Sequence, residues 1–311
     1  MELVSDAGRP IAVIGEGMLE LTLQAGAWRV GTAGDALNVA THLARFGRPV
    51  DFITALGADP VSTHLRQSWA AEGIGVAHVL TDAVRAPGLY AISVDAEGER
   101  SFTYWRSDSA ARGLFTAPGI EAALEAARPA PLLYFSLISL AVIPPEGRDR
   151  LFQLCGEMRE TGGQVAFDTN YRPALWDSVG AAREAAERFI AVTDIGLPTF
   201  SDEALLFGDG GPGVTARRWR DAGVREVAVK CGAAGCLLST GEEEMTIAPP
   251  GSIVPLDTSG AGDAFNAGYL NASLRRLPPT SRALAGHALA GWVVSRPGAL
   301  PARDAGFDYG L

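Results

Sequence analysis

One stretch of this 311-residue chain decides the fold: Asp257-Thr258-Ser259-Gly260-Ala261-Gly262-Asp263-Ala264-Phe265. Its two glycines allow backbone N–H groups to approach a ligand closely at the start of a helix, where anions bind. We therefore expect Gly260, Ala261 and Gly262 to form an anion hole for a phosphoryl group in transfer. Asp263, in the first turn of that helix, is placed to accept a proton from an attacking hydroxyl, and the helix dipole is expected to keep it ionised. The alternative for this stretch alone is a glycine-rich loop with an aspartate helix cap.

Outside this stretch, short apolar runs alternate with longer helical patterns. This order predicts βαβ units and a mostly parallel sheet covered by helices on both faces, an α/β fold. The predicted strands are Ile11–Ile14, Val50–Thr54, Leu132–Ser136, Val165–Asp168, Asp194–Leu197, Glu226–Lys230 and Cys236–Ser239. The predicted helices are Gly34–Phe46, Thr63–Ala71, Arg148–Thr161, Gly180–Ala191, Arg217–Ala222, Gly262–Arg275 and Ser281–Val294.

One region departs from the alternation. Glu20–Leu23, Leu89–Val94 and Ser101–Arg106 are predicted strands, and Asp95-Ala96-Glu97-Gly98-Glu99 supplies a hairpin turn between the last two. A small antiparallel sheet inserted into the α/β core accounts for them, facing the carboxyl ends of the main strands, where a lid would lie. We treat residues 1–311 as a single domain, with the lid formed by about 17–33 and 88–110.

Composition excludes several classes of function. Acidic residues number 36 and basic residues 26, a net charge of −10, and no basic block compensates, so binding to nucleic acid is not expected. The longest early apolar run, Ile11–Ile14, is too short for a signal peptide, and no 18-residue apolar stretch predicts a membrane span. The three cysteines lack metal-ligand spacing. We expect a cytoplasmic protein.

Two common nucleotide-binding motifs are absent from the sequence. Gly15-Glu16-Gly17 imitates the start of a dinucleotide fingerprint, but Glu20 occupies the third glycine position. A Walker loop needs Gly-Lys-Ser/Thr, and the chain's one lysine, Lys230, stands between Val229 and Cys231. If the protein uses ATP, it must therefore bind it through a fold other than the Rossmann or Walker-loop folds.

The stretch at 257–265 resembles the C-terminal signature of the PfkB, or ribokinase-like, carbohydrate kinases. The N-terminal signature is also similar: Gly31-Thr32-Ala33-Gly34-Asp35-Ala36-Leu37-Asn38-Val39-Ala40, then Leu43-Ala44-Arg45-Phe46-Gly47. Ala33 departs from the family, which usually has a glycine there, but Gly34 is retained. The resemblance spans essentially the whole chain. It implies a ribokinase-like fold, phosphorylation of a sugar by ATP, and contacts of Gly34 and Asn38 with that sugar.

Three further stretches resemble the 2-keto-3-deoxygluconate kinases of this family: Phe102-Thr103-Tyr104-Trp105-Arg106, Tyr134-Phe135-Ser136 and Phe167-Asp168-Thr169-Asn170-Tyr171-Arg172-Pro173-Ala174-Leu175-Trp176. Residues 102, 104 and 106 share one face of a strand, so Tyr104 and Arg106 can contact one ligand. A guanidinium group matches a carboxylate, which favours an acidic sugar. The expected substrate-binding residues of the lid and main body are Gly34, Asn38, Tyr90, Tyr104, Trp105, Arg106 and Arg172. A solvated face is the alternative for Arg106, and packing within the lid for Tyr90.

The nucleotide-binding part of the site is assigned from a further stretch, Lys230-Cys231-Gly232-Ala233-Ala234-Gly235-Cys236. This stretch resembles the family's Lys-x-Gly-x-x-Gly turn beside ATP. A lysine after a buried strand is costly unless paired, so we expect a phosphate partner. The residues assigned to ATP are Asn170, Arg172, Lys230, Gly232, Gly235, Gly260 and Gly262. Thr199 and Asp202 replace the family's Asn-x-x-Glu, so no metal ligand is assigned. Mg²⁺ would be held mainly by ATP and water, and a monovalent cation is a further candidate cofactor.

The expected reaction is ATP-dependent phosphorylation of 2-keto-3-deoxygluconate to its 6-phosphate. The alternatives are a fructokinase, a ribokinase, a 2-keto-3-deoxygalactonate kinase, or a non-catalytic sugar-acid sensor. Because the lid strands carry apolar side chains on both faces, we also expect a homodimer joined lid to lid, or a larger assembly built from it. The alternative is a monomer whose lid folds onto its own core.

Overall fold

The main sheet forms the centre of the molecule. The computed structural model describes residues 8–24, 26–94, 100–241, 243–251 and 253–310. The strands of the main sheet are β1 (Ile11–Ile14), β4 (Val50–Gly57), β5 (Ile74–Gly75), β6 (Val79–Asp82), β9 (Leu132–Ser136), β10 (Gln164–Asp168), β11 (Ile195–Gly196), β12 (Glu226–Lys230), β13 (Cys236–Thr240) and β14 (Glu243–Ile247). Their order is β14-β13-β12-β11-β10-β9-β1-β4-β5, and β6 also pairs with β4. The strands run parallel except at the β12–β13–β14 edge, so the expected mostly parallel sheet is confirmed.

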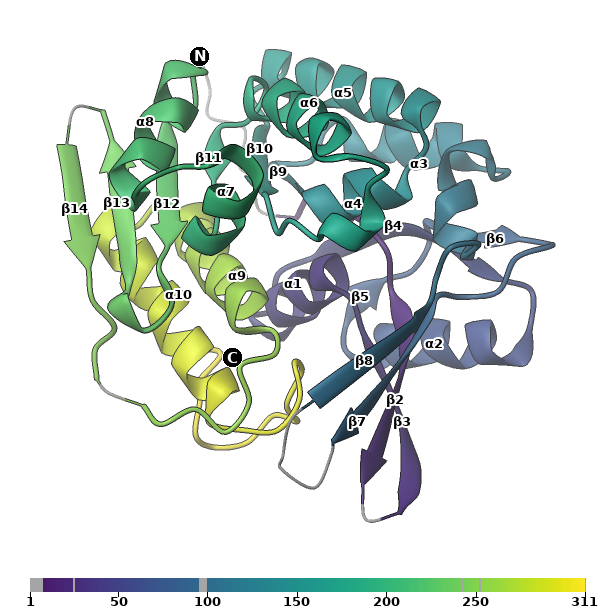
Figure 1. Ribbon diagram of the computed structural model, residues 1–311. Coiled ribbons are helices and arrows are strands. Elements are labelled where there is room, and N and C mark those ends of the chain that lie inside the picture. The colour runs from purple at the N-terminus through teal and green to yellow at the C-terminus, as the bar shows by residue number, and fades with distance from the viewer. Residues whose placement is uncertain (1–7, 25, 95–99, 242, 252, 311) are drawn as a thin grey trace.

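Helices cover both faces of this sheet (Figure 1). One layer contains α1 (Asp35–Arg45), α2 (Pro60–Ala71), α9 (Ala261–Leu274) and α10 (Pro279–Val294). The other contains α3 (Ile120–Ala127), α4 (Leu137–Val142), α5 (Pro145–Glu160), α6 (Val179–Ile190), α7 (Phe200–Phe207) and α8 (Pro212–Asp221). Short 3₁₀ turns lie at Ala110–Thr116, Pro173–Leu175 and Gly232–Ala234. Along β1, Ile11 and Val13 pack toward the first layer, and Ala12 and Ile14 toward the second. Burial on both faces explains the continuous apolar strands.

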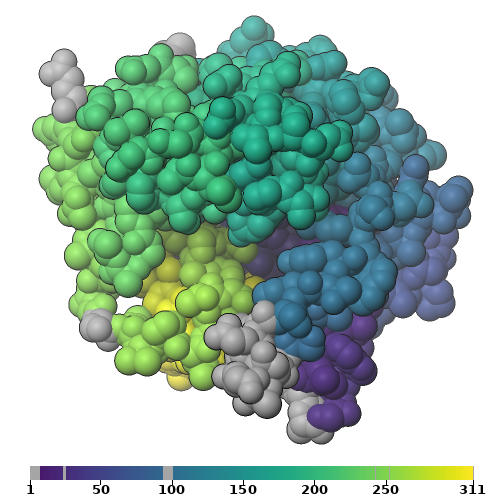
Figure 2. Space-filling model, viewed as in Figure 1, coloured from purple at the N-terminus to yellow at the C-terminus, as the bar shows by residue number. Residues whose placement is uncertain are grey.

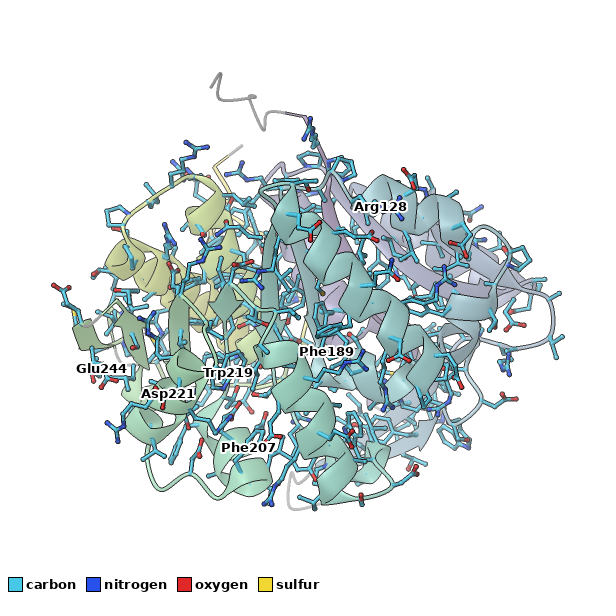
Figure 3. All side chains as sticks on the ribbon, turned by 90° about the horizontal axis from the view of Figure 1, so that it is seen from above. Arg128, Phe189, Phe207, Trp219, Asp221 and Glu244 are labelled. Atoms are coloured by element: carbon cyan, nitrogen blue, oxygen red, sulfur yellow. The ribbon has the colours of Figure 1, made fainter. Side chains whose placement is uncertain are left out.

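An aromatic cluster fixes the second helix layer against the sheet. The ring of Phe189 on α6 lies 5.3 Å from that of Phe135 on β9, and the ring of Trp219 on α8 lies 5.9 Å from that of Phe167 on β10. Figure 3 labels Phe189 and Trp219 on the helices that cross this face. A Cβ atom on Gly196 of β11 would lie 2.4 Å from the Trp219 ring, so glycine is required there. This packing holds the carboxyl ends of β9 and β10 in place.

A separate four-stranded sheet, here called the lid, projects from the main body (Figure 1). Its strands are β2 (Met18–Gln24), β3 (Ala27–Ala33), β7 (Leu89–Val94) and β8 (Arg100–Trp105), in the order β3-β2-β7-β8. β2 and β7 pair in parallel, so the sheet is mixed rather than antiparallel throughout, which corrects the sequence expectation. The expected hairpin turn at 95–99 lies outside the described residues.

Among the described residues, no helix combines the length and apolar character needed to cross a membrane.

Candidate active site

A cleft of about 980 Å³ lies between the lid and the main body. Figure 2 shows the surface hollowed where the blue lid strands approach the yellow-green C-terminal segments. Residues of both signature stretches line this cleft together with lid residues. Those that the sequence assigned to substrate or phosphate are Gly34, Asn38, Tyr90, Tyr104, Arg106, Arg172 and Gly260.

Asp263 is bound to Asn38, which lies 225 positions earlier in the chain. Gly260 is the N-cap of α9 with φ of 69°, and a Cβ atom there would lie 2.7 Å from the Ala299 carbonyl oxygen, so glycine is needed for the turn. Asp263 then falls in the first helical turn. Its Oδ2 accepts a hydrogen bond from Asn38 Nδ2 at 2.7 Å. Within the described structure, the buried Oδ1 of Asn38 has no hydrogen-bond partner. Asn38 lines the cleft, whereas Asp263, Ala261 and Gly262 lie outside the cleft lining, so the amide of Asn38 stands between the cleft and the Asp263 carboxylate.

The environment of Asp263 shifts its protonation. Burial raises the pKa of Asp263 to about 7, with the negative charges of Asp35 and Asp168 acting in the same direction and the Asn38 hydrogen bond and Lys230 opposing them. The expectation that the helix dipole keeps this carboxyl fully ionised is therefore corrected, because desolvation outweighs it. A carboxyl with a pKa near neutrality is suited to accept a proton in catalysis.

Lys230 is engaged inside the protein. Its Nζ donates to Asp168 Oδ2 at 2.6 Å and to Asn266 Oδ1 at 2.9 Å. Asn266 Nδ2 also donates to Asp168 and to the Tyr134 hydroxyl, at 2.7 and 3.1 Å. A Cβ atom on Gly262 would lie 3.6 Å from Lys230 Nζ, so the ammonium group lies directly under the glycine loop. Lys230 is thus already paired within the protein and brings positive charge to the loop, and its assignment to ATP phosphate stays a prediction.

Several residues of this network, Asn266, Asp35 and Asp168 among them, were not assigned from the sequence. Asn266 stands three positions after Asp263 on α9, and that helical spacing is the signal that could have found it. Asp35, in the first turn of α1, lines the cleft, and its Oδ2 accepts hydrogen bonds from the Ser136 hydroxyl and from Asn170 Nδ2, the latter at 3.2 Å. The backbone N–H of Asn170 donates to Asp168 Oδ1 at 3.1 Å. The carboxyl ends of β9 and β10 are therefore joined to the start of α1.

The lid presents a polar and aromatic face to the cleft. The Tyr90 hydroxyl donates to the Glu20 carboxylate, and the Tyr90 and Tyr104 rings lie 5.7 Å apart. Arg106 forms an ion pair with Glu16. Strand alternation places Trp105 on the opposite face with its partner Leu89, and Trp105 is 56% exposed and does not line the cleft. The assignment of Trp105 to the substrate is therefore corrected.

The remaining candidates lie toward the nucleotide side. Arg172 lines the cleft with a half-exposed side chain, and its Nη1 lies 3.5 Å from Asp202 Oδ2. Gly232 and Gly235 lie at the turn between β12 and β13, outside the cleft lining. In the part of the chain that the structure describes, no group of three or more His, Cys, Asp or Glu side chains could hold a metal ion.

Comparison with known proteins finds relatives that cover nearly the whole chain. Residues 11–305 match the model of the pfkB family carbohydrate kinases. The 2-dehydro-3-deoxygluconokinase of Dickeya dadantii (strain 3937) is 38% identical over 93% of this chain and 96% of its own length. That of Escherichia coli (strain K12) is 37% identical over 96% of this chain and 98% of its own length. The crystal structure of aminoimidazole riboside kinase from Salmonella enterica, complexed with aminoimidazole riboside and an ATP analog, matches with a TM-score of 0.79 at 26% identity, over 94% of this chain and 95% of that one.

Proposed function

Because the chain belongs to the pfkB family of carbohydrate kinases, we propose that it transfers the γ-phosphoryl group of ATP to the primary hydroxyl of 2-dehydro-3-deoxygluconate, which is 2-keto-3-deoxygluconate. The observation that carries this function is the Asn38–Asp263 hydrogen bond beside the glycine loop, in a chain that matches kinases of that name over 93% of its length. A non-catalytic sugar-acid sensor would have no need of a base next to an anion hole.

The residues around the cleft divide the work of phosphoryl transfer. Asp263 accepts the proton of the attacking hydroxyl, and Asn38 holds that carboxylate in place. The N–H groups of Gly260 to Gly262 stabilise the charge on the transferred group at the N-terminus of α9, and the ammonium of Lys230 adds to the positive potential from below. Because this transfer has a loose transition state, positioning contributes more than base strength.

The substrate lies under the lid in this proposal. Gly34 allows close backbone approach, and Tyr90 and Tyr104 hydrogen-bond sugar oxygens from the lid. Arg106, directly after lid strand β8, and Arg172, in the loop after β10, both line the cleft and would face the carboxylate. A guanidinium fork at this position favours an acid over a neutral sugar.

ATP approaches from the side of β12 and β13. Asn170, Arg172, Gly232 and Gly235 are the proposed contacts, together with the glycine loop. Mg²⁺ would come with ATP, held mainly by phosphates and water, and would neutralise phosphate charge. A monovalent cation remains a candidate cofactor. We also propose a cytoplasmic location, on the ground that ATP is a cytoplasmic metabolite.

A second copy of this chain is the proposed partner of the lid. The lid face opposite to Tyr90 and Tyr104 carries Trp28, Val30 and Trp105, which are 53%, 63% and 56% exposed; of the three, Val30 also borders the cleft. Register places the three on one face, since Val30 pairs with Leu21 and Trp105 with Leu89 in a sheet where Leu21 pairs with Ala91. A homodimer joined lid to lid, or a larger assembly built from it, would cover this apolar surface.

The direct test of the reaction is the position of the new phosphate. The purified chain, ATP, Mg²⁺ and 2-dehydro-3-deoxygluconate are incubated and the product is examined by ³¹P–¹H NMR. We expect coupling of phosphorus to the two protons on C6. Phosphate on another oxygen, or no transfer to this acid while fructose, ribose or the galactonate epimer is phosphorylated, would overturn the substrate assignment.

A further inference from the structure

The four points at which the chain crosses between the lid and the main body meet at Glu16. The chain passes through Gly17 into β2, returns from β3 through Gly34, passes through Gly88 into β7, and leaves β8 at Arg106. Glu16 itself follows β1 and precedes the first crossing. Three of the four crossings are thus glycines, and the fourth carries a positive charge.

Contacts at these crossings leave little freedom to Glu16, whose side chain is 1% exposed. A Cβ atom on Gly34 would lie 2.2 Å from the backbone oxygen of Glu16, and one on Gly88 would lie 2.6 Å from its Oε1. Its Oε2 accepts a hydrogen bond from Nη2 of Arg106. Gly34 thus packs against the backbone of Glu16, and Gly88 against Oε1, which has no hydrogen-bond partner among the described residues, while Oε2 binds the fourth crossing, Arg106.

Arg106 depends on this partner. Its side chain is 9% exposed, and a guanidinium group at that burial requires an opposite charge nearby. Arg106 lines the cleft and Glu16 does not. Within the described residues, the buried Nε of Arg106 has no hydrogen-bond partner. Glu16 thus occupies one nitrogen of the guanidinium group and leaves another donor without an acceptor.

We propose that Glu16 is a positioning residue for sugar-acid recognition: it anchors Arg106 at the root of the lid, so that the remaining guanidinium donors meet the substrate carboxylate. This inference rests on the proposed function. Glu16 does not touch the substrate and acts through Arg106. The competing role is purely structural, a charge that stabilises the lid crossings without affecting which sugar is bound.

The test compares Glu16→Ala, Glu16→Gln and Glu16→Asp in the full-length enzyme. Removal of the carboxylate should raise KM for 2-dehydro-3-deoxygluconate by roughly 10- to 150-fold, as for loss of one charge-assisted hydrogen bond, and leave kcat within about threefold. Glu16→Gln keeps a neutral acceptor for Nη2 and should give a smaller rise. Glu16→Asp retracts the carboxylate by one methylene group, and its KM should lie between those of Glu16→Ala and Glu16→Gln. It also supplies a second variant if Glu16→Ala does not fold. The kcat/KM for fructose, which has no carboxylate, should stay within about threefold.

A double-mutant cycle distinguishes the two roles of Glu16. If Glu16 acts through Arg106, Glu16→Ala should add almost nothing to the KM of Arg106→Ala. The control is Glu226→Ala, which breaks a carboxylate–guanidinium pair with Arg282 at 2.6 Å outside the cleft lining and should leave KM unchanged. Additive effects, or equal losses for the acid and fructose, would overturn the inference. If the wild-type enzyme neither phosphorylates the acid nor is thermally stabilised by it, the proposed function fails together with the inference. If the wild type turns over the acid normally and Glu16→Ala has an unchanged KM, only the inference fails.

Discussion

Asp263 joins three properties at one residue: burial in the first turn of α9, a hydrogen bond from Asn38, and a pKa raised to about 7. All three properties result from the position of Asp263 beside the glycine loop, and an exposed aspartate elsewhere would have none of them. Replacement of Asp263 by the isosteric asparagine removes the charge without a change of shape and so tests the role of the carboxylate.

The first prediction concerns turnover of Asp263→Asn. The amide can still pair with Asn38 after rotation of the side chains, so folding and ATP binding should be nearly retained, but it cannot accept a proton. We expect kcat to fall by roughly two to four decades, the contribution of a positioned base. Steady-state kinetics and ATP titration of the same preparation measure both. Near-normal turnover would remove Asp263 from the chemistry.

The second prediction concerns stability against pH. The folded-state pKa of Asp263, about 7, lies above the ordinary value of 3.8, so the folded protein binds this proton more tightly than the unfolded chain. The stability contributed by the protonated carboxyl is complete below the unfolded pKa and is lost as pH rises through 7. An asparagine at position 263 does not titrate, so its contribution to stability does not change with pH. Measured by denaturant unfolding, the free energy of unfolding of Asp263→Asn should rise relative to that of the wild type between pH 5 and 8, by on the order of a few kcal/mol. A difference that stays constant with pH would refute the raised pKa.

Single residues also show what the sequence could and could not reveal. Asn38 and Asp263 were each assigned to the site from two motifs that resemble one family, but the hydrogen bond between them was not predicted, because it forms only where α1 and α9 come together. The pairing of Lys230 with Asp168 was not foreseen, because nothing in a local pattern identifies a partner 62 positions away. Trp105 could have been excluded: the alternation that places Tyr104 and Arg106 on one face places Trp105 on the other.

At the scale of elements, the long periodic segments were predictable and the short ones were not. The helices at 34–46, 262–275 and 281–294 are confirmed within a few residues. β5 has two residues and α4 has six, too few for a period of 2 or 3.6 to show. β14 begins with two glutamates and exposes four of its five residues at the edge of the sheet, and its existence depends on pairing with β13. Tertiary contacts, not local preference, create these elements.

The N-terminus of α9 carries the third prediction. In Gly260→Ala, the new Cβ would lie 2.7 Å from the Ala299 carbonyl oxygen at a φ of 69°, so the loop must shift and its N–H groups leave their positions. We expect kcat to fall by about 10² or more, as when an oxyanion donor is lost. Gly156→Ala, on α5 with nothing within 4 Å of the new Cβ, is the matched control and should retain turnover. Equal activity of the two variants would contradict the role of the loop.

The whole molecule gives the fourth prediction. With the outer lid face covered by a second copy, sedimentation at micromolar concentration should show twice the chain mass of 32.5 kDa, or a multiple of that dimer. Trp28→Glu combined with Trp105→Glu should yield monomers, because two charges cannot be buried unpaired at the contact. A wild-type species of single-chain mass, unchanged by substrate, would refute the lid-to-lid dimer.

The arrangement of the molecule as a whole connects these scales. The parallel sheet brings the ends of β9, β10 and β12 to one edge, α1 and α9 add the two signature stretches, and the lid lines the cleft with Tyr90, Tyr104 and Arg106. The central claim is that this cleft selects a sugar acid for phosphorylation by ATP.

A competition assay tests that claim most directly. The purified enzyme is given ATP, Mg²⁺ and an equimolar mixture of 2-dehydro-3-deoxygluconate, fructose and ribose, and mass spectrometry follows which sugar gains phosphate at early times. We predict that the acid is phosphorylated at least about tenfold faster than either neutral sugar, since one charge-assisted hydrogen bond separates them. Equal phosphorylation of fructose, or preference for a neutral sugar, would contradict the account.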